Sequence, residues 1–423
     1  MGYKGKIYMK SFKNQLAEAA GSGKNTHLVH LEDLILDGGV KGARQAILAL
    51  RSLRDMLSGS AKSSVDVTVK WDGAPAVFAG EDPSDGKFFV AKKGIFNANP
   101  KIYKSHEDID ADTSGDLNTK LKMAYDYIKP LGVKGVIQGD FMFDKSDLKK
   151  EKIDGVPHIV FHPNTIAYAV PLDQPLAKEI GSAKIGIVWH TIYSGATFET
   201  MRAEFGRPIV SKLKPSKDVW MVDATLPDLS GTATLTKSET EALNNKLSAA
   251  GKLFRKISGS TLKELESNKE LNLVINVYNN RKVREGQRIT NTKSHAMGLI
   301  TFVQERYQKE IDKRKSQKGK DTQSTKRDEL LKFFDTSNIK NLQNVFDLQN
   351  LVVDSKLIII NKLNSLNKIG TFVKTKSGFK VTNPEGFVAI DRMEGGAVKL
   401  VDRLEFSTNN FSKDIIKGWD SPN

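Results

Sequence analysis

The spacing of hydrophobic residues divides the chain into helical and β-rich segments. Near the N-terminus, apolar residues recur every three to four positions, which predicts a short helix over 30–36 and a long amphipathic helix over 40–57. From residue 65 to 222 the pattern changes to short β-branched and aromatic runs broken by Gly, Pro and Asp, as in strands. The predicted strands span residues 65–69, 76–79, 88–91, 136–141, 158–161, 165–170 and 185–192.

A second helical segment interrupts this β pattern. Residues 236–368 contain no Pro and few Gly, and apolar residues return at helical spacing, as in Leu243, Leu247 and Phe254. The β pattern resumes over 371–406. We therefore expect an α+β fold in which a β core, split in the sequence, is interrupted by a helical insertion. The expected parts are an N-terminal helical region 1–64, a first core segment 65–235, the insertion 236–368 and a second core segment 369–423.

Composition excludes several classes of protein. Cysteine is absent, so disulfides, cysteine zinc sites and thiol nucleophiles are excluded, and we expect a cytoplasmic protein. No apolar run reaches the roughly 18 residues that cross a bilayer, so we expect no membrane partner. The net charge is +15, and the insertion alone carries 26 Lys and Arg against 15 Asp and Glu. Such an excess favours polyanions, above all nucleic acid.

The most cationic part of the insertion spans residues 306–327. Its lysines and arginines fit either a solvated helix face or a surface that follows a phosphate backbone, and the sequence leaves both open. The candidate nucleic-acid-binding residues are Lys309, Lys313, Arg314, Lys315, Lys318 and Lys320.

One short motif carries candidate catalytic chemistry. The predicted strand 65–69 runs into Lys70-Trp71-Asp72-Gly73, which places a lysine at a strand end before an acid–glycine turn. A lysine held beside a nucleotide, with its pKa lowered by desolvation and neighbouring cations, can attack an α-phosphate. Gly73 would let the backbone turn close to a ligand. The same residues also fit a common β-hairpin with an Asp-Gly turn, so the motif alone leaves both interpretations open.

The residues around this motif resemble the covalent nucleotidyltransferase superfamily of DNA ligases, RNA ligases and mRNA-capping enzymes. Its members use Lys-x-Asp-Gly to form a lysyl-nucleotide intermediate, and further motifs follow in a fixed order. Candidates for these motifs occur here in that order on predicted strands. They are 91–94 with Lys92, 136–141 with Asp140, either 185–190 with Trp189 or 165–170 with Tyr168, 384–390 with Glu385, and 397–401 with Lys399.

The resemblance implies a core of two antiparallel sheets with a nucleotide between them, interrupted by the basic insertion and preceded by the N-terminal helices. It implies catalysis by Lys70 as the nucleophile, assisted by Asp72, Glu385 and Lys399. It implies ATP as the nucleotide and Mg²⁺ as the metal, bound by Asp140 and Glu385. The implied nucleotide-binding residues are Val69, Trp71, Gly73, Lys92, Asp140, Tyr168, Trp189 and Arg403.

The resemblance favours a divergent, phage-type ATP-dependent polynucleotide ligase, which joins 5′-phosphate and 3′-hydroxyl ends of RNA or DNA through a lysyl-AMP. Only 24 residues follow Lys399, fewer than the C-terminal OB domain of conventional DNA ligases and capping enzymes needs. If a phage encodes the protein, the host cytoplasm is its expected location. Two alternatives remain open: nucleotidyl transfer to another acceptor, as by a guanylyltransferase, and a non-catalytic nucleic-acid-binding protein with a degenerate core.

Overall fold

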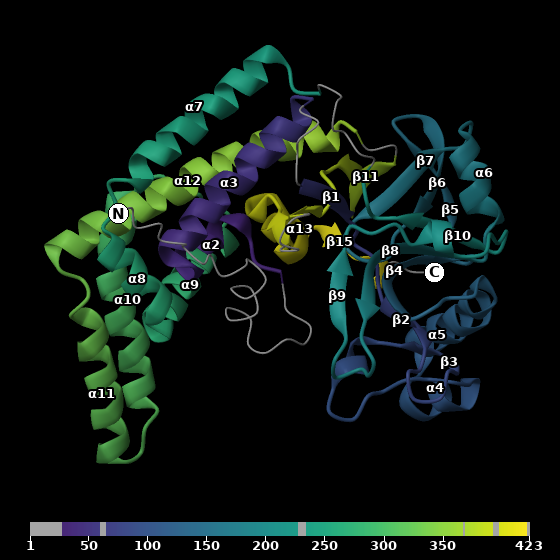
Figure 1. The fold of residues 1–423 in the computed structure, drawn as a ribbon, viewed down its shortest axis with the longest axis horizontal. Helices are drawn as coiled ribbons and strands as arrows, with labels where there is room; N and C mark the ends of the chain where they lie inside the picture. Colours follow the sequence, from purple (N-terminus) through teal and green to yellow (C-terminus); the bar gives the residue numbers. More distant parts are fainter. Residues whose placement is uncertain (1–27, 60–64, 227–233, 367–368, 392–396, 421–423) are drawn as a thin grey trace, which may run out of the picture.

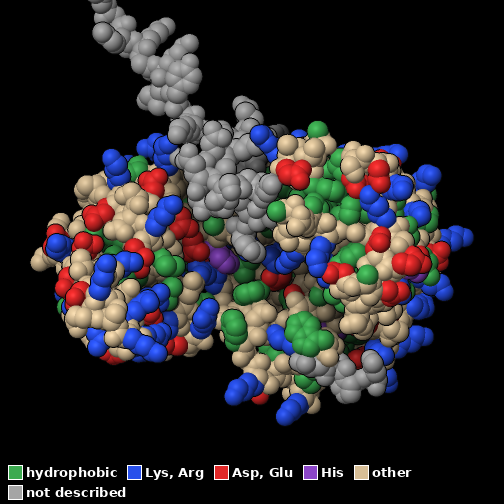
Figure 2. Space-filling model, turned by 90° about the horizontal axis from the view of Figure 1, so that it is seen from below, with side chains coloured by type: hydrophobic (Ala, Val, Ile, Leu, Met, Phe, Trp, Pro, Cys, Tyr) green, Lys and Arg blue, Asp and Glu red, His purple; other side chains and the backbone are tan. Residues whose placement is uncertain are grey.

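The computed structural model describes residues 28–59, 65–226, 234–366, 369–391 and 397–420. It has a helical lobe and a β-rich lobe, which meet at a small central sheet (Figure 1). Seen from below, a hollow separates the two lobes (Figure 2). The mixture of helices with mostly antiparallel sheets confirms the α+β class. Parts of the expected N-terminal region and of the segment boundaries lie outside the described residues.

The helical lobe combines the N-terminal helices with the predicted helical block. The N-terminal elements are η1 (Leu31–Asp33), α2 (Leu34–Asp37) and α3 (Gly39–Leu57). Their apolar faces share one hydrophobic core with the block, so the two sequence regions form a single packed unit. The helices of the block are α7 (Lys237–Phe254), α8 (Gly259–Ser267), α9 (Lys269–Arg284), α10 (Thr292–Asp312), α11 (Gln317–Leu331) and α12 (Thr336–Asn364).

The small sheet joins strands from both ends of the chain. It consists of β1 (Val65–Lys70), β13 (Gly386–Asp391) and β14 (Ala397–Leu400), all antiparallel, with β13 in the centre. Phe387 and Leu400 on this sheet are completely buried in the same core as the helices. Burying one face of the sheet against the helical lobe leaves its strand ends free to present polar residues toward the β-rich lobe.

A six-stranded sheet forms the centre of the β-rich lobe. Its strands follow the order β10-β8-β4-β2-β3, and β9 pairs with β8. Helices α4 (His106–Asp112) and α5 (Gly115–Ile128) pack against one face of this sheet. The strands are β2 (Ala76–Glu81), β3 (Phe88–Ala91), β4 (Val136–Asp144), β8 (Ile185–Ser194), β9 (Arg202–Phe205) and β10 (Val219–Asp223).

A third sheet also combines both core segments. Its order is β12-β11-β7-β6-β5, with β15 paired to β11. The strands are β5 (Lys149–Ile153), β6 (Val156–Phe161), β7 (Ala167–Pro171), β11 (Gly370–Thr375), β12 (Gly378–Val381) and β15 (Ile415–Ile416). Because β7 pairs with β11, the chain returns to the same β-rich lobe after the helical block.

The structure corrects three details of the expected fold. Three sheets are present among the described residues instead of two, because β1 pairs as a strand with β13 and meets the segment after β10 only through an isolated bridge from Thr68 to Thr225. Strand β10 runs parallel to β8, so the sheets are not entirely antiparallel. The end of the predicted β segment 371–406 is helical, since Asp402 accepts the amides of Leu404 and Glu405 and caps α13 (Arg403–Phe411). Among the described helices, none combines the length and apolarity that crossing a membrane requires.

Candidate active site

The pairing of β1 with β13 brings Lys70 and Glu385 together. Lys70 lies opposite Gly386 in the register, and Glu385 immediately precedes that strand. The Lys70 ammonium forms an ion pair with the Glu385 carboxylate, whose side chain is only 11% exposed. Burial raises the pKa of Glu385; Lys70 opposes this effect, and Asp72 and Asp140 add to it. The site therefore pairs a lysine with a carboxylate that has an increased affinity for a proton.

Lys399 lies on the neighbouring strand β14, opposite Val388. Burial lowers the pKa of Lys399, and so do the nearby charges of Lys70 and Arg403, whereas Glu385 acts in the opposite direction. Within the part of the chain that the structure describes, Lys399 forms no ion pair. Two lysines thus share one corner of the small sheet with the Glu385 carboxylate.

Asp72 fixes the turn that follows Lys70. Its carboxylate accepts hydrogen bonds from Asn164 Nδ2 at 2.7 Å and from the amides of Thr165 and Ile166 at 2.8 Å each. Burial raises the pKa of Asp72, while these hydrogen bonds and Lys70 lower it. The Asp72 amide also donates to the Tyr168 hydroxyl at 2.7 Å. The turn is therefore attached to the third sheet, which holds the end of β1 and Lys70 in place.

Gly73 allows this turn to pass directly against β4. A Cβ atom on Gly73 would lie 2.6 Å from Asp140 Cβ and 2.8 Å from Met142 Sδ, closer than real Cβ contacts allow. Asp140 therefore stands beside the turn, with its Oδ2 3.8 Å from His190 Nε2. The absence of a side chain at residue 73 brings a further carboxylate to the Lys70 corner.

The aromatic candidates lie mostly in the core. Tyr168 is 2% exposed and Trp189 is completely buried, because both point inward from their strands toward hydrophobic clusters. Trp71 is partly buried and stacks on Tyr168 with ring centroids 5.0 Å apart. Val69 packs against the core of the helical lobe. The structure thus places Tyr168 and Trp189 as supports beneath the site, and Trp71 as the aromatic residue closest to the Lys70 turn.

Lys92 and Arg403 are each held by other residues. Lys92 Nζ lies 2.9 Å from Asp112 Oδ2. Hydrogen bonds from Lys101, Tyr103 and Lys92 hold the pKa of Asp112 well below its usual range. Arg403 Nη1 donates to Asp33 Oδ1 at 2.8 Å, and Nη2 donates to Asn280 Oδ1 on α9. Of the two, Arg403 lies close enough to influence Lys399, whereas the ion pair of Lys92 ties it to Asp112.

A buried charge cluster behind Lys399 was not expected from the sequence. Lys356 Nζ on α12 lies 2.7 Å from Glu32 Oε2, and the two side chains are 1% and 5% exposed. Burial alone would raise the pKa of Glu32, but Lys356, His30 and Arg403 lower it to about 2. The Lys399 amide donates to the Val29 carbonyl at 2.9 Å, so this cluster adjoins β14. The sequence feature that could have indicated this cluster is Lys356, a lysine within the apolar run 351–360.

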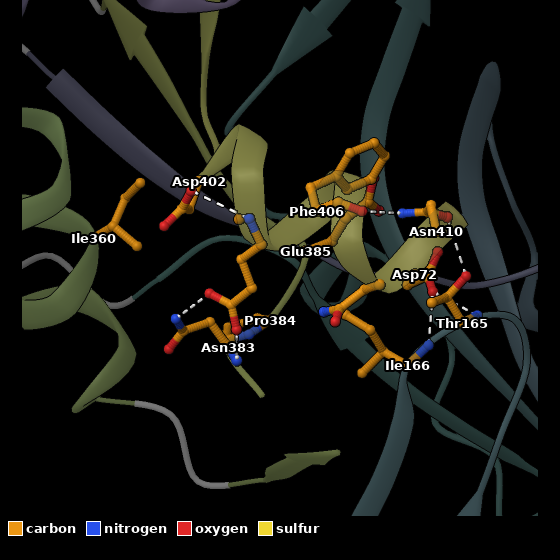
Figure 3. Close-up of a pocket in the computed structure, with 13 residues that line it drawn as sticks. Asp72, Thr165, Ile166, Ile360, Asn383, Pro384, Glu385, Asp402, Phe406 and Asn410 are labelled. Atoms are coloured by element: carbon orange, nitrogen blue, oxygen red, sulfur yellow. Dashed lines mark hydrogen bonds between the residues drawn. The ribbon is translucent and has the colours of Figure 1, made fainter. Parts of the chain in front are cut away.

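A small pocket, lined mostly by polar residues, lies beside the Lys70–Glu385 pair. Figure 3 shows Asp72, Thr165 and Asn410 together on one side of it and Asn383 with Pro384 on the other. Glu405 accepts hydrogen bonds from the Thr382 hydroxyl and the Asn383 amide, which orders the loop before Glu385. The full lining is Asp72, Thr165, Ile166, Ile360, Asn383, Pro384, Glu385, Gly386, Asp402, Glu405, Phe406, Asn409 and Asn410.

The carboxylates fit a metal that is shared with a ligand better than a complete protein cage. No group of three or more His, Asp or Glu among the described residues is arranged to bind a metal ion. Mg²⁺ is commonly held by one or two carboxylates together with substrate phosphates. Since Glu385 is engaged by Lys70, Asp140 is the carboxylate best placed for this use.

The candidate nucleic-acid-binding residues lie away from this corner, at the tip of the α10–α11 pair (Figure 1). Lys309 is near the end of α10, and Arg314 and Lys315 lie in the connection between the helices. Lys318 and Lys320 are in the first turn of α11. The structure therefore groups these residues with one another and does not bring them to Lys70.

Comparison with known proteins relates the whole fold to one family. No curated protein and no solved structure matches the chain. Residues 25–415 match a family of unknown function (DUF6267), a range that includes both lobes and every candidate residue discussed above. Because this match covers nearly the entire sequence, the chain belongs to the DUF6267 family of unknown function.

Proposed function

We propose that the protein is an ATP-dependent polynucleotide ligase that acts through a lysyl-AMP intermediate. The observation that carries this proposal is the corner of the small sheet, where Lys70 is paired with the buried Glu385 and Lys399 lies on the next strand but one. Asp72 and Asp140 border the same corner. Asp140, Glu385 and Lys399, which come from three of the resembling motifs and are far apart in the sequence, thus lie around Lys70.

In the first step, the Lys70 ammonium transfers a proton to Glu385, which contacts Nζ and whose pKa is raised by burial, and the resulting amine attacks the α-phosphorus of ATP. A P–N bond forms and the P–O bond to pyrophosphate breaks. The second proton on the nitrogen leaves with the departing pyrophosphate. Lys399 neutralises charge on the phosphates. Mg²⁺, when bound at Asp140, would supply further neutralisation of the triphosphate.

Two transfers complete the reaction. AMP moves from Lys70 Nζ to a terminal 5′-phosphate, which breaks the P–N bond and forms a P–O–P bond. A 3′-hydroxyl then attacks that activated phosphorus, a phosphodiester forms, AMP leaves, and the hydroxyl proton is released. Asp72 contributes by holding the Lys70 turn through its hydrogen bonds to the loop before β7. It acts on position rather than on the phosphates.

Covalent labelling tests this proposal directly. The purified protein is incubated with Mg²⁺ and α-labelled ATP or GTP, denatured, and examined for retained label, after pyrophosphate treatment to remove any AMP already bound. We expect label from ATP in the wild type and none in Lys70→Ala. Lys178→Ala is the matched control, because Lys178 is an exposed lysine on α6 (Pro175–Ser182), outside every candidate motif, and it should label normally.

Other outcomes separate the alternatives. Label from GTP in place of ATP would favour a guanylyltransferase. An ATP label that never passes to nucleic acid ends would favour another acceptor. Absence of label with either nucleotide would contradict an enzymatic function and would leave nucleic-acid binding by a degenerate core as the working hypothesis.

A further inference from the structure

The paired helices α10 and α11, here called the arm, carry cations with few neutralising partners. Residues 306–327 contain nine Lys and Arg against three Asp and Glu. Lys309, Lys313, Arg314, Lys315 and Lys318 are exposed. Among the six candidate residues at the tip, Lys313 forms an ion pair, with Glu310 at 2.8 Å, and the structure shows none for the others over the residues it describes. Exposed, unpaired cations at this density attract phosphate.

The cationic stretch of the arm, residues 306–327, exposes no aromatic side chain on which bases could stack. Its stretch 306–327 contains one aromatic residue, Tyr307, which is 3% exposed and donates its hydroxyl to Glu270. Proteins that bind single strands combine cations with exposed aromatic side chains, each base gaining roughly 1–3 kcal/mol from stacking. The exposed large hydrophobic residues of the described chain all lie outside this stretch: Leu48, Val156, Leu273, Met297, Val381, Phe411 and Trp419.

The length of the arm is comparable with that of about nine base pairs of a double helix. The first residue of α10, Thr292, is attached to α12 by a hydrogen bond from its hydroxyl to Asp347 at 2.7 Å. The 21 residues of α10 then extend about 31 Å, at about 1.5 Å per residue. That length corresponds to roughly nine base pairs at about 3.4 Å each.

The arm and the β-rich lobe lie on opposite sides of the hollow that separates the lobes. Figure 1 shows the arm descending on one side and the β-rich lobe on the other, with β1 of the small sheet between them. Figure 2 looks into the hollow from below and shows lysine and arginine side chains on the helical lobe.

We propose that the arm binds the phosphate backbone of a double-stranded nucleic acid without reading its sequence. The cations supply contacts to phosphate, and the lack of exposed aromatic residues disfavours a single strand. The binding surface itself stands independently of lysyl-AMP chemistry. Its extension, that the ligase acts on nicks or ends within a duplex, rests on the proposed function.

Equilibrium binding of the full-length protein tests the arm. Labelled DNA and RNA duplexes of about 30 base pairs, roughly three helical turns, are compared with the corresponding single strands by fluorescence anisotropy over a range of salt concentrations. The arm variant is Lys313→Glu/Arg314→Glu/Lys315→Glu. The control variant is Lys149→Glu/Lys150→Glu/Lys152→Glu, which makes the same change in net charge on three exposed lysines of the edge strand β5.

We expect the wild type to bind duplex at least roughly tenfold more tightly than single strand. The arm variant should lose that preference. Its plot of log association constant against log salt concentration should become less steep by roughly three, about one for each phosphate contact removed. The control variant should keep both the preference for duplex and the salt dependence of the wild type. Comparison of the DNA and RNA duplexes identifies which double helix is preferred.

Two results would overturn the inference. One is single-strand binding as tight as duplex binding in the wild type. The other is a control variant that loses as much duplex affinity as the arm variant, since general electrostatics would then explain the effect. ATP labelling of the same proteins keeps the two proposals separate: duplex binding that depends on the arm, without label in any protein, would sustain this inference and contradict the proposed enzyme.

Discussion

The buried charge cluster behind Lys399, here called the junction, and the arm use charge in opposite ways. At the junction, Glu32 and Lys356 are almost completely buried and paired at 2.7 Å. In the arm, Arg314, Lys315 and Lys318 are exposed, and the structure shows no ion pair for them over the residues it describes. Burial fixes the geometry of a charge and makes the loss of its partner costly, whereas exposed charges contribute little to folding and respond to salt. The junction therefore holds the strand of Lys399 in a fixed position, whereas the arm is suited to contact with a polyanion.

Breaking the buried pair tests the first half of this comparison and has the largest expected effect. Glu32→Gln leaves Lys356 buried without a carboxylate, so the free energy of unfolding should fall by about 3–5 kcal/mol. Lys246→Gln is the control, because its pair with Asp354 is about one third exposed on both sides (34% and 32%). It should cost about 1 kcal/mol or less. Urea denaturation measures both.

A double variant sharpens the same test. Glu32→Gln/Lys356→Met removes both charges and should recover most of the stability lost in Glu32→Gln. A double variant that is as unstable as the single variant would show that packing at this position, rather than the unpaired charge, causes the loss.

Removing the Asp72 carboxylate should have the next largest effect. Asp72→Ala leaves the buried amides of Thr165 and Ile166 without their acceptor, which should lower the free energy of unfolding by about 2–4 kcal/mol. Asp72→Asn keeps an acceptor oxygen and should lose less. ATP labelling should fall in parallel with these losses, because the turn positions Lys70. Equal stability of wild type and Asp72→Ala would contradict the positioning role.

His30 predicts a pH dependence of stability. Burial lowers the pKa of His30 from 6.5 to about 3. The unfolded chain therefore binds this proton before the folded chain does, and stability falls as the pH drops from about 6.5 toward 3. Between about pH 7 and pH 5 this loss amounts to about 2 kcal/mol. His30→Asn should lack this component, so the difference between variant and wild type should narrow at the lower pH in urea titrations.

The smallest effect is expected for the arm. The variant Lys313→Glu/Arg314→Glu/Lys315→Glu changes only exposed side chains, so its midpoint of urea unfolding should match that of the wild type. A clear destabilisation would mean that the arm charges serve the fold, and the contrast between arm and junction would then fail.

The sequence predicts elements better than their assembly. The helical block and most strands follow from hydrophobic spacing, because that spacing reports which face of each element is buried. Pairing between distant strands leaves no such periodic signal. The separate three-stranded sheet was therefore not anticipated, although the motifs that it brings together were.

Individual side chains show the same limit. The positions of Lys70 and Glu385 follow from their motifs, and the structure places the two in contact. Trp189 fits an aromatic motif equally well but is completely buried, because the strand alternation directs it beneath α5. Asp33 and Lys356 belong to no motif, and their importance arises only from burial at an interface between elements.

The pairing of β1 with β13 has a consequence for how the protein is made. This contact joins residue 70 to residue 386, so nearly the whole chain has to leave the ribosome before the small sheet can close. Contacts at such sequence separation form late, because the entropy of closing the intervening loop must first be overcome. The helices of residues 237–364 can pack with α2 and α3 before then and provide the surface on which the sheet closes. Lys70 therefore meets Glu385 and Lys399 only near the end of folding, and an incomplete chain carries an isolated lysine.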